Sequence, residues 1–202
     1  GIYPEEVALA ALTRRFGLPL RWVETRLEHM QATTHGRAQI ADYEVAVTPE
    51  GVVTALRAHV LADIGAYPVG PGIPNLTGAM AVGVYQIPAV EFTVTCVYTN
   101  TTPVAAYRGA GRPEAAYYIE RMMDAVATEL GLDPAEVRRR NFIPPDAFPY
   151  RTPVGTLYDT GEYDKSLTKA LEVGRYAELR AEQQRRIAAR AAGESVPLLG
   201  IG

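Results

Sequence analysis

Two arginines and two glycines in one short loop are the residues of this sequence best suited to chemistry. In order they are Arg108, Gly109, Gly111 and Arg112, and a long helical pattern begins directly after them at Pro113. Glycine lets a backbone approach a bound group closely, and the first turn of a helix offers unpaired N–H groups to an anion. Arginine adds charge-assisted donors. The loop therefore suits an anionic or oxygen-rich ligand.

The same loop fits two other patterns less well or no better. A dinucleotide-binding fingerprint needs three glycines, but Glu114 stands where the third is wanted, and no strand ending in an acid follows about twenty residues later. That class is excluded. The other interpretation is a tight strand-to-helix connection with Arg108 and Arg112 exposed to solvent. The residues alone favour ligand binding and this plain connection equally.

The other candidate catalytic or metal-binding residues favour structural roles. His29, His35 and His59 contain no pair at metal-ligand spacing. Ser166 and Ser195 are the only serines, and neither stands in a nucleophile-elbow context. The residues therefore predict neither a histidine metal site nor a serine nucleophile.

Composition excludes several classes of protein. The chain has 202 residues, of which 48% are hydrophobic and 21% charged, so it is long enough for one sizeable core. A net charge of −3 gives no electrostatic case for nucleic acid. Cys96 is the only cysteine, which excludes an internal disulfide and a cysteine-ligated cluster and fits a reducing compartment. No apolar run approaches the length of a membrane span, so we expect a cytoplasmic protein.

The elements that would position the loop follow from apolar periodicity and from helix end signals. Helices are expected at residues 4–16, 75–82, 113–130, 133–140 and 165–171, the last continuing past Gly174 to about Ala192. Strands are expected at 20–24, 37–47, 52–62 and 90–99, with a loop at 25–35 and the beginning of a further strand at 196–202. We therefore expect an α+β fold with two layers, an antiparallel sheet backed by the helices at 4–16 and 113–130.

Several short stretches carry a more specific signal. They are Tyr3-Pro4-Glu5-Glu6, Trp22-Val23-Glu24-Thr25-Arg26 with Glu28-His29, Thr34-His35-Gly36-Arg37, the run AYRGAGRPE at 106–114, Tyr118-Ile119-Glu120-Arg121, Arg138-Arg139-Arg140-Asn141-Phe142 and Tyr158-Asp159-Thr160-Gly161-Glu162-Tyr163. In this order they resemble the molybdenum-binding large subunit of the xanthine dehydrogenase and aldehyde oxidase family, closest to its carbon monoxide dehydrogenase-like branch. The resemblance spans essentially the whole chain.

The resemblance implies a fragment of a molybdenum hydroxylase or dehydrogenase large subunit. In that family a molybdopterin, expected here in the cytosine dinucleotide form, carries molybdenum and oxidises an aldehyde or N-heterocyclic carbon with water-derived oxygen. Electrons leave through iron-sulfur centres to FAD. The implied partners are an iron-sulfur small subunit and an FAD-binding medium subunit, in a dimer of heterotrimers, together with a small-molecule substrate and no nucleic acid.

The resemblance also assigns regions and residues. Residues 1–158 would be part of the first molybdenum-cofactor-binding domain, and 159–202 a helical segment leading to a second cofactor-binding domain absent from this chain. Arg108 is the candidate catalytic residue, in contact with substrate or with a ligand of the metal, and no residue is expected to bind the metal directly. The expected cofactor-binding residues are Ala106, Tyr107, Arg108, Gly109, Ala110, Gly111 and Arg112.

Two positions depart from the pattern of the family. A copper-binding cysteine follows the arginine in the molybdenum-copper carbon monoxide dehydrogenases, where this chain has Gly109. A bulky aromatic residue stands two positions after the arginine in purine hydroxylases, where this chain has Ala110. Carbon monoxide oxidation is therefore an alternative to the main expectation, and a non-catalytic subunit-assembly module is another. A glycine-rich segment expected before Gly1 and the region of the catalytic glutamate are missing, so we expect a cut fragment that is inactive alone.

Overall fold

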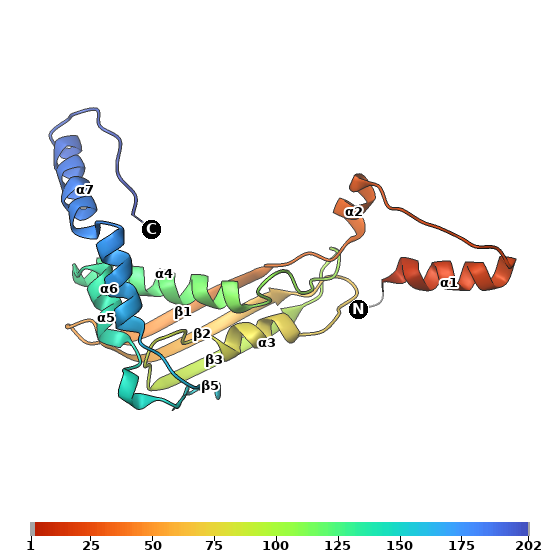
Figure 1. The fold of residues 1–202 in the computed structure, drawn as a ribbon, viewed down its shortest axis with the longest axis horizontal. Helices are drawn as coiled ribbons and strands as arrows, with labels where there is room; N and C mark the ends of the chain where they lie inside the picture. The colour runs from red at the N-terminus through yellow and green to blue at the C-terminus, as the bar shows by residue number, and fades with distance from the viewer. Residues whose placement is uncertain (1–2, 202) are drawn as a thin grey trace.

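A three-stranded sheet with helices over one face forms the body of the molecule (Figure 1). The structure is a computed structural model that describes residues 3–201. The strands are β1 (Gln39–Val47), β2 (Val53–Asp63) and β3 (Ala89–Val97), in the order β1-β2-β3, with a separate two-residue pair, β4 (Tyr150–Arg151) and β5 (Leu157–Tyr158). The helices are α1 (Pro4–Phe16), α2 (Arg26–Ala32), α3 (Gly72–Ala79), α4 (Arg112–Leu130), α5 (Pro134–Asn141), the 3-10 turn η1 (Pro145–Ala147), α6 (Tyr163–Val173) and α7 (Tyr176–Ala191). The α+β class is confirmed.

The end signals correctly placed the helices around the loop. Pro113 lies in the first turn of α4, and Gly131 ends that helix in the left-handed conformation at φ 64°. Asp133 caps α5, because its side chain accepts hydrogen bonds from the N–H groups of Ala135 and Glu136 at 2.8 and 3.3 Å. The two helices pack together behind the sheet, as predicted for 113–130.

The sheet is mixed, so the prediction of a wholly antiparallel sheet was wrong. β1 and β2, at the segments expected as strands, pair antiparallel as predicted, but β3 runs parallel to β2. A parallel pair needs a long crossover, and the glycine- and proline-rich segment between these strands supplies it, with α3 inside. Alternation of apolar residues marks a strand but does not give its direction, which is why the sequence could not show this.

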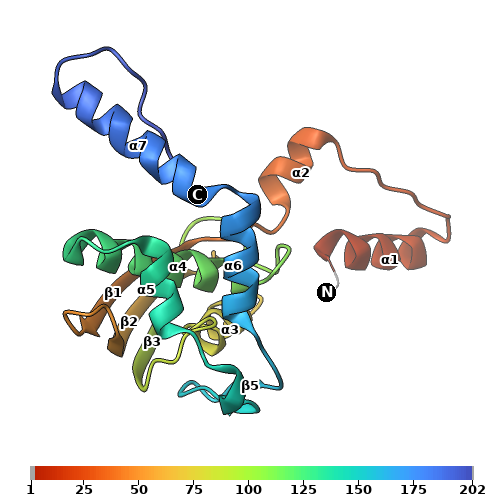
Figure 2. The same ribbon diagram turned by 60° about the vertical axis from the view of Figure 1, so that its left-hand side comes forward.

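The N-terminal region departs most from expectation. Residues 20–24 form no strand, and lie instead in an extended connection between α1 and α2. The expected loop at 25–35 contains α2, which begins with a capping box in which Thr25 and Glu28 bond each other's backbone N–H groups. Helix α1 forms as predicted but does not back the sheet. None of its residues is buried, and it lies apart from the body in both ribbon views (Figures 1 and 2).

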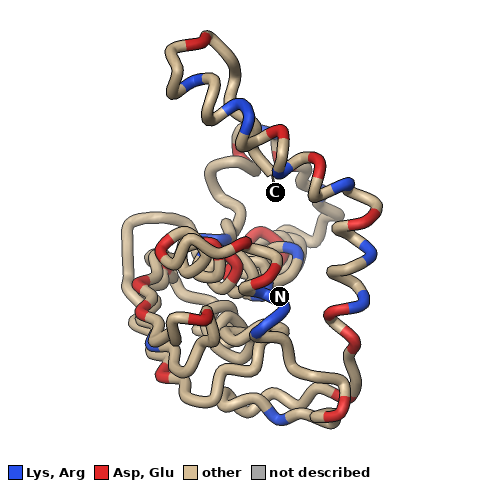
Figure 3. The backbone as a smooth tube through the Cα atoms, turned by 90° about the vertical axis from the view of Figure 1, so that its left-hand side faces the viewer, with Lys and Arg blue, Asp and Glu red and all other residues tan. Residues whose placement is uncertain are grey.

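The C-terminal helix is broken, contrary to the expectation of one continuous helix. The break falls at Gly174 and Arg175, and Arg175 adopts the left-handed φ of 52°. Beyond the break, acidic and basic residues are interspersed along α7 (Figure 3), and Glu182 pairs with Arg185 and Arg186. Residues 196–201, expected to begin a strand, have no strand partner within the described chain.

The core lies between the sheet and α4. Alternate residues of β2 are buried, as a strand covered on one face requires. The core combines β2, the segment after α3, α4 and α5, and its buried members include Val53, Leu56, Val82, Tyr85, Ile87, Ile119, Met122, Met123, Val126 and Val137. The two methionines of α4 are thus core residues. No helix among residues 3–201 is long and apolar enough to cross a bilayer.

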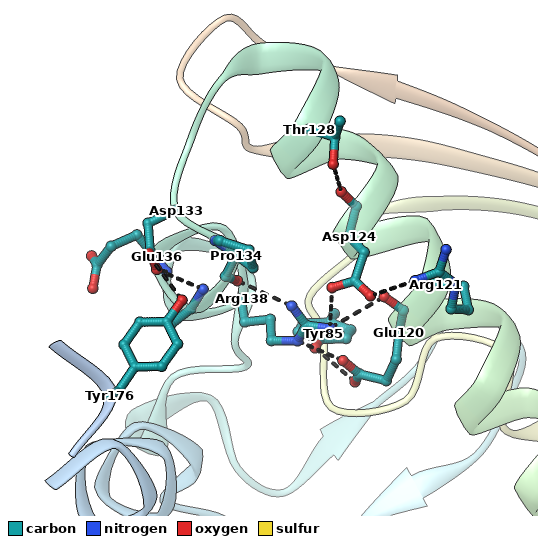
Figure 4. A network of polar contacts seen from close by, with 11 residues as sticks. Tyr85, Glu120, Arg121, Asp124, Thr128, Asp133, Pro134, Glu136, Arg138 and Tyr176 are labelled. Carbon is teal, nitrogen blue, oxygen red and sulfur yellow. Dashed lines mark hydrogen bonds and ion pairs between the residues drawn. The ribbon is translucent and has the colours of Figure 1, made fainter. Parts of the chain in front are cut away.

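A polar network joins the helices behind the core (Figure 4). Arg138 of α5 donates to Glu120 at 2.6 Å and to Asp124 at 2.9 Å, both on α4. The hydroxyl of Tyr85 donates to Glu120 at 2.7 Å. Burial of this phenol, followed by the charge of Glu120, raises the pKa of Tyr85. The network fixes α5 against α4, whose first turn follows the loop.

Candidate functional site

The predicted cofactor-binding residues form one exposed loop before α4. We refer to residues 106–112 as the glycine loop. Tyr107 is 66% exposed and Arg108 is also exposed, whereas Gly111 is buried. The loop therefore has an inner end anchored in the fold and an outer part open to a ligand.

The backbone of the glycine loop takes an unusual path. Gly109, Ala110 and Gly111 have successive φ values of 95°, 47° and 91°, all in the left-handed region. Two hydrogen bonds close the turn, from Ala110 N to the Tyr107 carbonyl at 2.8 Å and from Arg112 N to the Gly109 carbonyl at 3.2 Å. An alanine at positive φ is unfavourable by about 1 kcal/mol, so surrounding contacts must hold it there.

Close packing explains why glycine stands at two of these positions. A Cβ atom on Gly111 would lie 2.4 Å from the carbonyl oxygen of Ile73 and 2.8 Å from the amide nitrogen of Thr77, both in α3. A Cβ atom on Gly109 would lie 2.4 Å from Cγ of Pro113. The loop in this conformation admits no larger residue at either position.

A segment distant in sequence lies beside the glycine loop. His35 N donates to the Pro103 carbonyl at 3.1 Å, and Ala105 N donates to the His35 carbonyl at 2.9 Å. Gly36 permits this approach, because a Cβ atom there would lie 2.7 Å from Cβ of Tyr107. Residues 34–37, noticed in the sequence only for their resemblance, are therefore the neighbours of the predicted site.

Arg37 makes three contacts with the glycine loop and the helix after it. Its Nη1 donates to Glu114 Oε2 at 2.9 Å, and its Nη2 donates to the carbonyl oxygen of Arg108. Its guanidinium carbon lies 5.1 Å from the centre of the Tyr107 ring. The Glu114 side chain is only 5% exposed. Sequence reasoning missed both Arg37 and Glu114, because no local pattern links residues 77 positions apart.

Several donors of the loop are free of intramolecular partners. Within residues 3–201, the N–H groups of Gly109 and Gly111 and the guanidinium of Arg108 donate to no hydrogen bond, and Arg108 forms no ion pair. Backbone amides and guanidinium groups bind oxygen atoms that carry negative charge. The loop has the donors that the oxygen-rich part of an organic cofactor requires.

Two of the other stretches that carried the resemblance serve the fold. Asn141 is 2% exposed, accepts a hydrogen bond from Val53 N at 2.8 Å and donates to the Gly51 carbonyl at 2.8 Å. Tyr158 donates its hydroxyl to the Gly83 carbonyl at 2.9 Å. These residues join α5 and β5 to the core and take no part in the loop.

Comparison with known proteins identifies the family. The family model described as the molybdopterin cofactor-binding domain matches residues 1–142. The chain belongs to this family. The resemblance inferred from the short stretches is thereby confirmed.

Proteins similar to this chain are large oxidoreductase subunits. The carbon monoxide dehydrogenase large chain of Hydrogenophaga pseudoflava is 40% identical over 207 aligned residues, covering 100% of this chain and 25% of that protein. A crystal structure of a Cu,Mo-CO dehydrogenase is 36% identical with a TM-score of 0.92, covering 96% of this chain and 25% of the other. Quinoline 2-oxidoreductase from Pseudomonas putida 86 is 34% identical with a TM-score of 0.86, covering 95% and 25%. The chain spans about a quarter of the length of these relatives.

Proposed function

We propose that this chain forms one side of the cofactor site in a molybdenum-dependent hydroxylase or dehydrogenase, with the glycine loop in contact with the molybdopterin. The family match and the free donors of the loop support this proposal. Residues 1–158 would belong to the first cofactor-binding domain, and 159–202 would lead toward a second.

The residues of the loop have distinct tasks in this proposal. The exposed N–H group of Gly109 would hold an oxygen atom of the cofactor, the buried Gly111 would keep the loop in place beside it, and Arg112 would add a positive charge at the start of α4. The Arg108 guanidinium would orient a substrate oxygen or nitrogen, or an oxygen bound to the metal. When bound, the molybdopterin supplies the molybdenum at which a water-derived oxygen is transferred to carbon.

An aldehyde or an N-heterocycle is the proposed substrate class, and the observation that favours it is the packing at Gly109. A copper-binding cysteine would have to occupy this position, at φ 95° and with its Cβ atom 2.4 Å from the Pro113 ring. The loop in this shape does not accommodate it. Ala110 would also leave the substrate side of this site without the aromatic residue that stands at this position in purine hydroxylases, which would give room for a planar substrate. Carbon monoxide oxidation is the second candidate, because a carbon monoxide dehydrogenase is 40% identical.

The surroundings of the whole enzyme follow from the same proposal. The molybdopterin would be in the cytosine dinucleotide form, and an iron-sulfur subunit and an FAD subunit would carry the electrons away, in a cytoplasmic dimer of heterotrimers. Partner subunits are supported because the similar carbon monoxide dehydrogenase protein is named a large chain, which implies smaller chains beside it.

The complete gene, expressed with its partner genes, tests the proposal. We expect the purified complex to contain molybdenum without copper, and to reduce an artificial electron acceptor with an aldehyde or an N-heterocycle but not with carbon monoxide. A purified complex that contains no molybdenum would contradict the proposal. Copper together with carbon monoxide oxidation would establish the second candidate instead.

A further inference from the structure

We propose that Arg37 is a positioning residue that sets the direction in which the glycine loop presents its backbone donors. The proposal concerns the same site and rests on the proposed function for its catalytic consequence. Its structural content, that Arg37 orders the loop, stands on contacts of the described residues alone.

The first observation is the backbone of Arg37 itself. Its φ is 68°, in the left-handed region that a residue with a side chain rarely adopts. A residue is kept in such a conformation only where the surroundings require it, and such residues gather at functional sites. Here the conformation carries the side chain toward the glycine loop, beside the close contact between Gly36 and Tyr107.

The second observation is that one guanidinium group bonds both the loop and the helix that follows it. Nη2 bonds the Arg108 carbonyl in the middle of the loop, while Nη1 bonds Glu114, which lies in the first turn of α4. The planar fork of arginine can make both bonds at once, which the single ammonium of lysine cannot do in the same geometry. The Tyr107 ring against the guanidinium adds a third contact to the same group.

Because the Arg108 carbonyl and the Gly109 N–H belong to one planar peptide, the bond from Arg37 to the carbonyl also fixes the direction of the N–H. A trans peptide is planar, so its C=O and N–H groups point in opposite directions. The peptide that contributes the Arg108 carbonyl also contributes the Gly109 N–H. When Arg37 holds the carbonyl on its own side, the Gly109 N–H must point away from Arg37, and it donates to no atom of residues 3–201. Arg37 therefore presents this N–H to a ligand without touching the ligand.

The third observation is the state of Glu114. Its side chain is 5% exposed, and its Oε1 atom is buried with no hydrogen-bond partner among residues 3–201. A buried carboxylate with one oxygen unpaired depends strongly on its remaining partner, because an unpaired buried charge is unfavourable. The ion pair with Arg37 is thus the contact that keeps the Glu114 carboxylate in place, in the turn of α4 that follows the loop.

Two substitutions at position 37 test the proposal in the complete enzyme with its partner subunits. Arg37→Lys keeps the positive charge and a similar stem but removes the fork, and Arg37→Met removes the charge as well. The matched control is Arg57→Met, which removes an arginine that bridges Glu44 and Glu91 on the open face of the sheet. The readouts are amide hydrogen exchange of the peptide covering 104–114 in cofactor-free protein, and the Mo(V) spectrum of the loaded enzyme.

We expect both Arg37 variants to increase exchange in the 104–114 peptide by about tenfold or more, because each loses at least one hydrogen bond that involves a charged group. The Mo(V) spectrum should change in shape, and Arg57→Met should change neither readout. Unchanged exchange in both Arg37 variants would overturn the proposal.

A variant at the other end of the pair covers the case in which Arg37→Met fails to fold. Glu114→Gln keeps the size of the side chain and an acceptor oxygen but weakens the pair, and we expect faster exchange in the same peptide. Normal exchange in both Glu114→Gln and Arg37→Lys would equally overturn the proposal. An absence of molybdenum in the wild-type complex would instead remove only the proposed function, since the exchange measurements need no cofactor.

Discussion

Gly111 is the residue that fixes how deeply the glycine loop is set into the fold. Its position against the Ile73 carbonyl and the Thr77 amide leaves no space for a side chain, and its φ of 91° is unfavourable for any residue but glycine. We predict that Gly111→Ala lowers the free energy of unfolding of the complete large subunit by about 2–4 kcal/mol. Denaturant unfolding measures this change.

Gly131 offers the matched control for that substitution. It is also in the left-handed region, at φ 64°, but no atom lies within 4 Å of the Cβ that alanine would add. Gly131→Ala should therefore lower the free energy of unfolding by only about 1 kcal/mol, the cost of placing alanine in the left-handed backbone conformation. Equal losses for the two variants would mean that the contact with α3 is of no consequence.

Gly109 separates the two candidate reactions. We predict that Gly109→Cys does not create a copper site, because the Cβ atom would meet the Pro113 ring and the backbone would have to leave its φ of 95°. Copper content of the purified complex, measured after growth with added copper, should stay at the background of the wild type. Copper bound in proportion to the protein, with carbon monoxide oxidation, would contradict the prediction and show that the loop can be rebuilt.

At the scale of elements, Arg138 joins α5 to α4 more strongly than any exposed pair can. Its side chain is 19% exposed and donates to two carboxylates and two backbone carbonyls. We predict that Arg138→Met lowers the free energy of unfolding by about 2 kcal/mol, because Glu120 and Asp124 lose their shared partner. Thermal and denaturant unfolding of the complete subunit measure the loss.

Arg121 provides the comparison for Arg138. It also pairs with Asp124, at 3.0 Å, but its side chain is 65% exposed. Ion pairs in water contribute little, so Arg121→Met should change stability by less than about 0.5 kcal/mol. A similar loss for both arginines would indicate that burial of the network has no effect.

Elements with strong local signals were predictable from the sequence, and those defined by distant contacts were not. Both ends of α4 were marked correctly by Pro113 and Gly131, and the start of α5 by Asp133 and Pro134, because caps act within one turn. The strand at 20–24 was wrong, because a short alternating segment becomes a strand only where a partner is available to bond it. The break at Arg175 also had no clear local signal beyond Gly174.

In the candidate site too, residues with local sequence signals could be predicted and residues defined by distant contacts could not. The glycines and arginines of the loop stand together in sequence, so a single loop that contains all of them could be predicted, but the burial of Gly111 against α3 could not. Arg37 could not be assigned, since its partners Arg108 and Glu114 are brought to it only by the completed sheet. Whether the loop contacts a cofactor stays a prediction.

At the scale of the whole molecule, two partly buried tyrosines, Tyr43 and Tyr176, make stability depend on alkaline pH. Burial, and secondarily the neighbouring Tyr118, raises the pKa of Tyr43, while burial and the hydrogen bond to Asp133 raise the pKa of Tyr176 to about 12. The unfolded chain loses these protons near pH 10, before the folded chain does. Their contribution to stability is therefore fully present below about pH 10 and is lost as pH rises toward the pKa values of the folded chain, with the larger loss from Tyr43 because solvent screens the more exposed Tyr176.

We predict that Tyr43→Phe reduces this alkaline loss. The variant should also be neutral or slightly stabilising near pH 8, because the Tyr43 hydroxyl is buried without a partner among residues 3–201. Unfolding free energies of the complete subunit at several pH values between about 8 and 11 measure the slope. Tyr117→Phe, at a 64% exposed position, should leave the slope unchanged. Destabilisation by Tyr43→Phe near pH 8 would reveal a partner for the hydroxyl outside the described residues.

The parallel pairing of β2 and β3 also sets the order in which the site can be built during translation. The segment that carries Arg37 leaves the ribosome early, but its partner Glu114 lies beyond the α3 crossover and all of β3. Contacts between residues this far apart form late, after the intervening chain has closed. A nascent chain that has not yet extended past the first turn of α4 therefore has every strand of the sheet and still no ordered glycine loop. Under the proposed function, cofactor loading would have to wait for that turn, so the site would be filled only after synthesis has passed it.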